Sequence, residues 1–269
     1  MRMKLFLCAT LLFVSAGLSA ADESRTIAII GTGDMGDSLG PQFAKMGYQV
    51  VYGSRHPESD KAKSLVRLTG NNARVVSQQD AAAASRIILL ALRWPAMESV
   101  VKSLDLDGKV VIDISVAWKQ GEDGYPESTI QPSAAELIQE WKPKAKVVKS
   151  FATAGSTVID NPTGAGGMVT MPVASNHRDA KELVAKMVAE MGFDPVDFGP
   201  LRMAHIIEDM QIMWLIPVIQ QRQTGWEIHF RRSNPPCHWG ATAEWALPVY
   251  DANDLAGIPQ TQKIPEPCP

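Results

Sequence analysis

The stretch that most constrains this chain is Gly-Thr-Gly-Asp-Met-Gly at positions 31–36. It follows a short β-rich run, residues 26–30, and it opens a helical pattern over residues 37–47. In that context the three glycines predict a dinucleotide-binding turn, since they allow a tight turn, admit a pyrophosphate to the backbone and let strand and helix pack closely. A glycine-rich turn without a ligand is the alternative. The residues expected to hold the dinucleotide here are Gly31, Thr32, Gly33, Asp34, Met35 and Gly36.

The rest of the chain alternates apolar strands with helical patterns. Residues 86–92 and 109–115 are near-continuous apolar runs, and residues 95–104 and 178–192 have helical spacing. This alternation predicts an α/β fold with a doubly wound, Rossmann-type parallel sheet covered on both faces. The apolar pattern from about residue 199 to 223 predicts one long C-terminal helix across the end of the sheet. The proline-rich, aperiodic sequence after it predicts an irregular extension.

The end of the second predicted strand indicates which dinucleotide is bound. An NAD site places an acid about 20 residues past the glycines, on the ribose 2′-hydroxyl. Here Ser54, Arg55 and His56 stand in that place. A guanidinium and a hydroxyl suit a 2′-phosphate, which a carboxylate would repel, so the sequence predicts NADP. An arginine in a solvated loop is the alternative.

Leu92 and Arg93 follow the fourth predicted strand, in the sequence Ala-Leu-Arg-Trp-Pro. Loops at the carboxyl ends of parallel strands lie beside the cofactor. We therefore expect Leu92 and Arg93 to flank the ribose or the nicotinamide, whereas Trp94 fits either the site or ordinary packing.

Several stretches together resemble a known family. The sequence "IGTGDMGDSLG", followed by "GSRHP", "KVVIDIS", "KVVKSFAT" and "GFDPVDFGPL", resembles the NADPH:coenzyme F420 oxidoreductases and the reductase domain of the STEAP-type metalloreductases. The resemblance runs from about residue 26 to about residue 221. It implies an NADPH-binding Rossmann domain that passes hydride to a flavin, as FAD or FMN, or to a deazaflavin such as coenzyme F420.

The same resemblance implies that Leu92, Thr153 and Ala154 line the nicotinamide side. One departure puts the acceptor contacts in doubt, because the family often has Phe-Asn-Thr where this chain has Phe151-Ala152-Thr153. A glycine-rich stretch at residues 160–169 lacks the Lys-Ser/Thr pair of a phosphate loop, and it is expected to form a flexible loop near the acceptor.

Acid–base catalysts are hard to find, in keeping with a hydride transfer that mainly needs stacked rings. His205 and Glu208 lie one helical turn apart and are candidates to relay a proton, although a surface i, i+3 pair is the more ordinary interpretation. Asp113 is either a buried structural carboxylate or a group near the ribose. No His or Cys pair has metal-ligand spacing, so no metal is expected.

Residues 1–21 have the pattern of a signal peptide, with Arg2 and Lys4 before an apolar run and small residues around Ala20 and Ala21. This predicts a periplasmic or secreted protein without a later membrane span, or a cytoplasmic one if the segment is not a signal. Cys237 and Cys268 are then a candidate disulfide. A formal net charge of −3 argues against a nucleic-acid partner, and a homodimer stays open.

These observations divide the chain into a signal peptide over 1–21, an NADP-binding reductase domain over 25–228 and an extension over 229–269. The favoured function is hydride transfer between NADP(H) and a small-molecule redox acceptor of the flavin or deazaflavin type. Two alternatives remain: an NADP-dependent reductase of a small imine or hydroxy acid, and a non-catalytic periplasmic dinucleotide- or flavin-binding protein.

Overall fold

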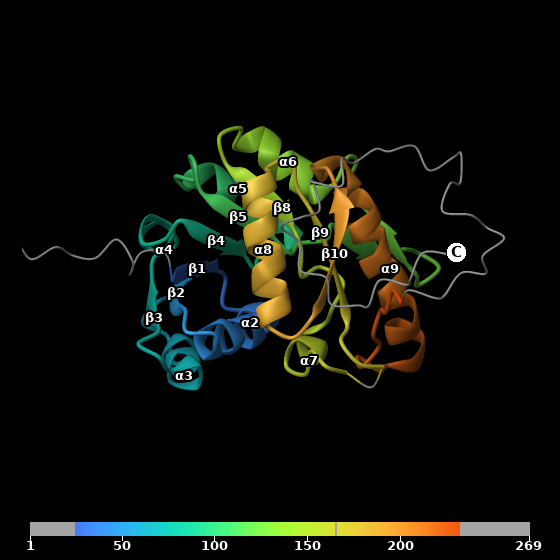
Figure 1. Cartoon of the computed structure of the whole chain (residues 1–269), viewed down its shortest axis with the longest axis horizontal. Coiled ribbons are helices and arrows are strands. Elements are labelled where there is room, and N and C mark those ends of the chain that lie inside the picture. The colour runs from blue at the N-terminus through green and yellow to red at the C-terminus, as the bar shows by residue number, and fades with distance from the viewer. Residues whose placement is uncertain (1–24, 165, 232–269) are drawn as a thin grey trace, which may run out of the picture.

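The computed structural model describes residues 25–164 and 166–231, and its centre is an eight-stranded sheet (Figure 1). The strand order is β10-β9-β8-β5-β4-β1-β2-β3, and every neighbouring pair is parallel except β8 and β9. The order reverses between β1 and β4, which is the switch point of a doubly wound sheet. The fold class predicted from the sequence is thereby confirmed. The strands are β1 (Thr26–Ile30), β2 (Gln49–Gly53), β3 (Arg74–Val76), β4 (Ile87–Leu90), β5 (Val110–Asp113), β8 (Lys146–Lys149), β9 (Thr170–Ala174) and β10 (Asp194–Gly199).

Helices cover both faces of the sheet and enclose two separate apolar cores. One core contains side chains of α2, α3 and α8, and the other contains side chains of α4, α5 and α6. In Figure 1, α8 crosses in front of the sheet. The helices on the two faces are α2 (Asp34–Lys45), α3 (Asp60–Thr69), α4 (Gln78–Ala83), α5 (Trp94–Ser103), α6 (Ala134–Trp141) and α8 (Arg178–Glu190), and the short α7 (Ser156–Ile159) lies against α2.

Serine caps set the start of three of these helices. Ser59 Oγ accepts from the Ala62 amide at the start of α3, and Ser77 Oγ accepts from the Asp80 amide at the start of α4. Ser133 begins α6 and forms a reciprocal capping box with Glu136. Each cap satisfies an amide that the helix itself leaves without a partner.

The predicted C-terminal helix begins later than expected. Residue 199 closes strand β10, a 3₁₀ turn spans Leu201–Met203, and α9 runs over Ala204–Gln221. The start predicted near residue 199 is therefore wrong, because the β-rich run 194–199 pairs with β9 as an edge strand. A short hairpin of β6 (Trp118–Gln120) and β7 (Pro126–Ser128) packs against α9.

Residues 222–231 lie against the body of the domain and hold the glycine-rich stretch. The Thr170 amide donates to the Ile228 carbonyl at 2.9 Å, and Glu227 accepts from the Gly166 amide at 3.3 Å. Arg231 donates to the Gly166 carbonyl at 3.1 Å. The stretch expected to be flexible is thus tied down at Gly166, and the packing continues three residues past the boundary predicted at 228.

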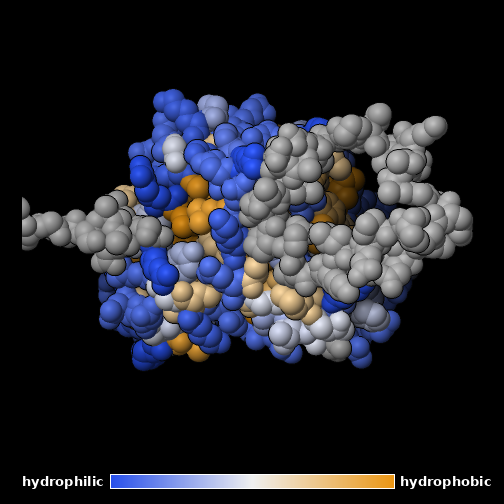
Figure 2. All heavy atoms as spheres, viewed as in Figure 1, coloured by the Kyte–Doolittle hydropathy of each residue, from blue (hydrophilic) through white to orange (hydrophobic). Residues whose placement is uncertain are grey.

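The remaining terminal predictions lie outside the described residues. These are the signal peptide, most of the 229–269 extension and the Cys237–Cys268 pair. Within residues 25–164 and 166–231, no helix combines the length and apolar character that crossing a bilayer requires. The face shown in Figure 2 is mostly hydrophilic, with scattered apolar areas.

Candidate active site

The glycine turn joins β1 to α2 at the switch point of the sheet. Gly31 has a φ of +124°, and a Cβ there would lie 2.2 Å from the Ala91 carbonyl oxygen. A Cβ on Gly36 would lie 2.6 Å from the Gly31 carbonyl oxygen. A Cβ on Gly33, in contrast, would meet nothing within 4 Å. Internal packing therefore explains the first and third glycines, and the open space above Gly33 fits a ligand that approaches the backbone.

Two adjoining cavities lie at the carboxyl ends of the strands on either side of this turn. The first, here called the Arg55 cavity, has a volume of about 490 Å³ and lies beyond β1 and β2. The second, here called the Trp118 cavity, has a volume of about 550 Å³ and lies beyond β4, β5 and β8. Both are lined by Gly33, Ala91, Leu92 and Arg93, so the cavities are halves of one crevice. A crevice of this form at the switch point is where dinucleotides bind in such folds.

The Arg55 cavity contains the predicted 2′-phosphate residues. Ser54, Arg55 and His56 all line it, and the His56 amide donates to Ser54 Oγ at 3.0 Å. Arg55 is exposed, and it has no carboxylate partner within the described parts of the chain. Lys61, from α3, adds a second cation to the same lining and lies 3.8 Å from Asp37. Lys61 is not among the predicted site residues because α3 itself was not predicted, although Ser59 and Gly70 are typical residues for its two ends.

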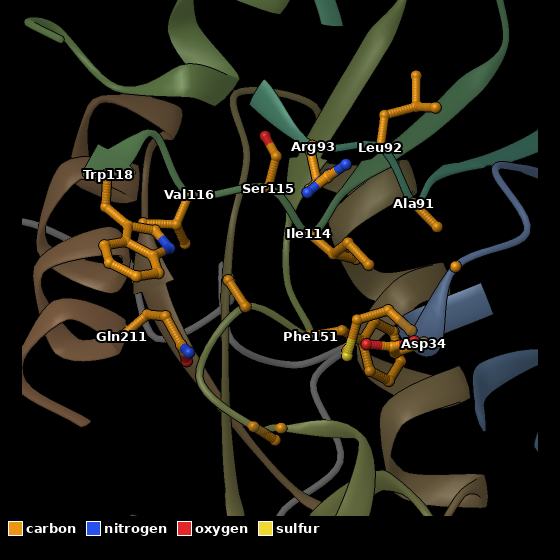
Figure 3. A pocket seen from close by; sticks show the side chains of 15 residues that line it. Asp34, Ala91, Leu92, Arg93, Ile114, Ser115, Val116, Trp118, Phe151 and Gln211 are labelled. Carbon is orange, nitrogen blue, oxygen red and sulfur yellow. The ribbon is translucent and has the colours of Figure 1, made fainter. Parts of the chain in front are cut away.

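The Trp118 cavity is walled by residues that come from distant parts of the chain. Figure 3 shows Trp118 from the β6–β7 hairpin and Gln211 from α9 on one side, with Phe151 and Asp34 on the other. Trp118 is 40% exposed, so its indole is available to a ligand. Phe151 follows β8 and has a φ of +56°, which turns the chain sharply beneath the cavity. A partly exposed indole beside an open hollow suits a flat aromatic ligand.

The predicted residues distribute unevenly between the two halves. Asp34, Met35 and Ala154 line the Trp118 cavity, and Leu92 and Arg93 line both cavities. Gly31 and Thr32 line the Arg55 cavity, and Gly36 packs within the turn.

The expectation for Thr153 differs from the structure. Thr153 is 1% exposed, and its hydroxyl lies 3.8 Å from Met171 Sδ, while its neighbours Ala152 and Ala154 line the cavity. The Thr153 side chain therefore points into the core.

The candidates His205 and Glu208 do not meet at the crevice. Glu208 is 5% exposed, so a surface pair of these two residues is wrong. Its carboxylate accepts from the Ala134 amide at 2.9 Å, at the start of α6, and lies 2.9 Å from Lys149 Nζ. The ring of His205 bonds instead to the Arg202 carbonyl at 2.6 Å. Neither side chain is part of the Trp118 cavity lining.

Asp113 proves to be a buried structural carboxylate. Lys149, at the end of β8, lies between Asp113 and Glu208, with 2.9 Å from its Nζ to each carboxylate. The side chains of Lys149 and Asp113 are fully buried, and that of Glu208 is 7% exposed. Burial alone would lower the pKa of Lys149, but the two carboxylates outweigh burial and raise it. Burial raises the pKa of Glu208, against the opposing effect of Lys149.

Comparison with known proteins identifies the family. The family model described as "NADP oxidoreductase coenzyme F420-dependent" matches residues 26–117. The F420-dependent NADP reductase of Methanothermobacter thermautotrophicus is 30% identical over 203 residues, which cover 68% of this chain and 84% of that protein. The chain belongs to this family. The F420-dependent NADP oxidoreductase family consists of NADP-dependent oxidoreductases, so the enzyme class and the cofactor predicted from the sequence are confirmed.

Other relatives extend the comparison. The metalloreductase STEAP2 of Mus musculus is 29% identical over 216 residues, covering 77% of this chain and 41% of that protein, so the chain spans about two fifths of the metalloreductase. A candidate F420-dependent NADP reductase of Arthrobacter sp. FB24 shares the fold, with a TM-score of 0.70 and 24% identity over 77% of this chain and 99% of that one. A protein from Sinorhizobium meliloti has a TM-score of 0.60 and 29% identity, over 67% and 88% respectively.

Proposed function

We propose that this protein transfers hydride between NADP(H) and a flavin or deazaflavin, with the dinucleotide along the crevice and the acceptor ring in the Trp118 cavity. The observation that carries the proposal is the continuity of the two cavities across Leu92 and Arg93. A dinucleotide whose 2′-phosphate lies at Arg55 and whose pyrophosphate lies over Gly33 would extend its nicotinamide toward the Trp118 cavity.

The Trp118 cavity supports an aromatic acceptor. Its volume of about 550 Å³ exceeds what a nicotinamide ring alone requires, and Trp118 offers a flat, partly exposed face. In the proposed reaction, NADPH gives up a hydride, which carries two electrons, and the acceptor ring gains that hydride and one proton. The protein's part is to stack the two rings and to exclude water, which lowers the barrier without a dedicated acid–base residue.

The relatives support the same acceptor class. The archaeal relative at 30% identity is an F420-dependent NADP reductase, which makes a deazaflavin the first acceptor to test and a flavin the second. The STEAP2 relative is a metalloreductase of which this chain spans about two fifths, so metal reduction is not proposed for this chain.

Steady-state kinetics with the purified protein test the proposal. NADPH oxidation is followed with coenzyme F420, FMN or riboflavin as acceptor, and NADH replaces NADPH in a parallel series. We expect turnover with at least one of these acceptors, no comparable turnover with NADH, and a raised NADPH KM in Arg55→Ala. Arg74→Ala is the matched control, because Arg74 is an exposed arginine on β3 that lines neither cavity.

Two outcomes would replace the proposal with one of its alternatives. Turnover restricted to a small imine or hydroxy-acid couple would indicate a reductase of that class. Tight NADPH binding without turnover of any acceptor would indicate a binding protein.

Export is a separate part of the proposal, supported by the pattern of residues 1–21. N-terminal sequencing of the protein from its native cells should begin near residue 21 or 22. A chain that begins at Met1 would contradict export, and it would place the enzyme where NADPH is made.

A further inference from the structure

The loop after β5 is held by an unusual set of buried hydrogen bonds. Ser115 donates from both its amide and its hydroxyl to Asp113 Oδ1, at 2.9 Å and 2.6 Å. Lys149 Nζ donates to Asp113 Oδ2 at 2.9 Å and also to the Ser115 carbonyl oxygen. Ser115 is therefore fixed through three of its own polar groups, and Glu208 on the far side holds Lys149 in place.

This arrangement determines the direction of the Ser115 hydroxyl. A carboxylate accepts hydrogen bonds and does not donate them. Asp113 Oδ1 accepts from both the amide and the hydroxyl of Ser115, so the Ser115 hydroxyl proton points toward Asp113. Only the lone pairs of Ser115 Oγ are then left for another partner.

Ser115 also lies at the wall of the Trp118 cavity. Ser115 is 5% exposed and is one of the residues that line the Trp118 cavity. Within residues 25–164 and 166–231, no group donates a hydrogen bond to Ser115 Oγ. A ligand N–H that reaches Ser115 Oγ would therefore meet an acceptor that no donor of these residues occupies.

We propose that Ser115 Oγ selects ligands by accepting a hydrogen bond from an amide N–H in the Trp118 cavity. This inference rests on the proposed function. Two groups in the proposed reaction carry such an N–H beside a carbonyl: the carboxamide of nicotinamide and the imide of a flavin or deazaflavin ring. A ketone in place of the amide has no N–H to donate to Ser115 Oγ. An N-methyl group would likewise place a methyl group, and not a donor, against Ser115 Oγ.

The first arm of the test needs only binding. Dissociation constants are measured for NADP⁺ and for its 3-acetylpyridine analogue, which replaces the carboxamide by a methyl ketone. If the carboxamide is the partner, the wild type prefers NADP⁺ by roughly tenfold, the range expected when a buried acceptor loses its donor. Ser115→Ala reduces this preference to about one, and the control Ser64→Ala, in α3 outside both cavities, leaves it unchanged.

The second arm tests the acceptor imide. The KM of riboflavin is compared with that of 3-methylriboflavin, with NADPH saturating. If the imide is the partner, methylation raises KM by roughly tenfold in the wild type and has little effect in Ser115→Ala, while kcat changes less than KM.

The outcomes separate cleanly. Loss of discrimination in either arm supports the inference and identifies the source of the N–H. Discrimination that is equal in the wild type and in Ser115→Ala in both arms would overturn it. A protein that binds NADP⁺ but reduces no flavin refutes the proposed function, yet the first arm still decides the role of Ser115 in dinucleotide binding.

Discussion

Replacing Lys149 should destabilise the protein strongly, because its ammonium lies between two buried carboxylates. Lys149→Met keeps the length of the side chain and removes the charge. Asp113 and Glu208 then remain buried, with side chains 0% and 7% exposed, and without the ammonium that lies 2.9 Å from each. Removing one partner of a buried ion pair costs about 3–5 kcal/mol, which is a large part of the total stability of a typical domain.

The cost of Lys149→Met should depend on pH. Without Lys149, the two carboxyl groups of the folded variant keep their protons to higher pH than those of the unfolded chain. The folded variant then binds more protons, so its unfolding free energy rises as the pH falls toward 4, and the deficit relative to wild type shrinks. Above pH 10.5 the deficit shrinks again, because the raised pKa of Lys149 gives the wild type stability that is lost as this group deprotonates.

Urea unfolding followed by tryptophan fluorescence at pH 4.5, 7 and 9 measures this effect. Lys146→Met is the matched control: it lies on the same strand, and its pair with Asp179 is on the surface, where such pairs contribute about 1 kcal/mol or less. Glu208→Gln in the Lys149→Met background should restore part of the stability at pH 7. A cost for Lys149→Met no larger than that of Lys146→Met, or one that does not change with pH, would refute the reasoning.

Three further predictions concern the core, the glycine turn and the acceptor. Tyr52 is fully buried, and burial raises its pKa to about 12. Between pH 10 and 12 the wild type should therefore lose about 2 kcal/mol of unfolding free energy relative to Tyr52→Phe, and equal slopes in denaturation at these pH values would contradict this. Gly31→Ala should lower the melting temperature, since its φ and its contact with a carbonyl exclude a side chain. Gly33→Ala should have the melting temperature of the wild type but lose the rise in melting temperature that NADP⁺ causes. If NADP⁺ raises the melting temperature of both variants as it does that of the wild type, the turn is not the phosphate site. In steady-state and binding measurements, Trp118→Ala should raise the acceptor KM several-fold and leave the NADP⁺ dissociation constant unchanged. An unchanged acceptor KM with a raised NADP⁺ dissociation constant would place the acceptor elsewhere.

Most of the sheet was predictable because its apolar strands and the glycine turn carry local signals, whereas the edge strand β10 was not predicted. The run over residues 87–92 is apolar throughout, as a strand buried on both faces must be, and the glycine turn needs only six consecutive residues. The β6–β7 hairpin has strands of three residues, too short for a recognisable period. For that reason Trp118 was not predicted to belong to the site.

The buried ion cluster was not predictable for a different reason. Lys149 stands in the sequence as an ordinary charged residue at the end of a strand, and its two partners lie 36 and 59 positions away. Only the pairing of β5 with β8 and the packing of α9 bring the three side chains together. The same packing decides that Glu208 is a structural residue, whereas helical spacing alone suggests a pair with His205.

Calorimetric titration of the wild type and of Arg55→Ala with NADP⁺ and with NAD⁺ tests the central claim most directly. The account predicts that the wild type binds NADP⁺ about 10- to 100-fold more tightly than NAD⁺, as a charge-assisted hydrogen bond to the 2′-phosphate requires, and that Arg55→Ala loses most of this preference. Equal affinity of the wild type for the two dinucleotides, or a preference that survives in Arg55→Ala, would contradict it.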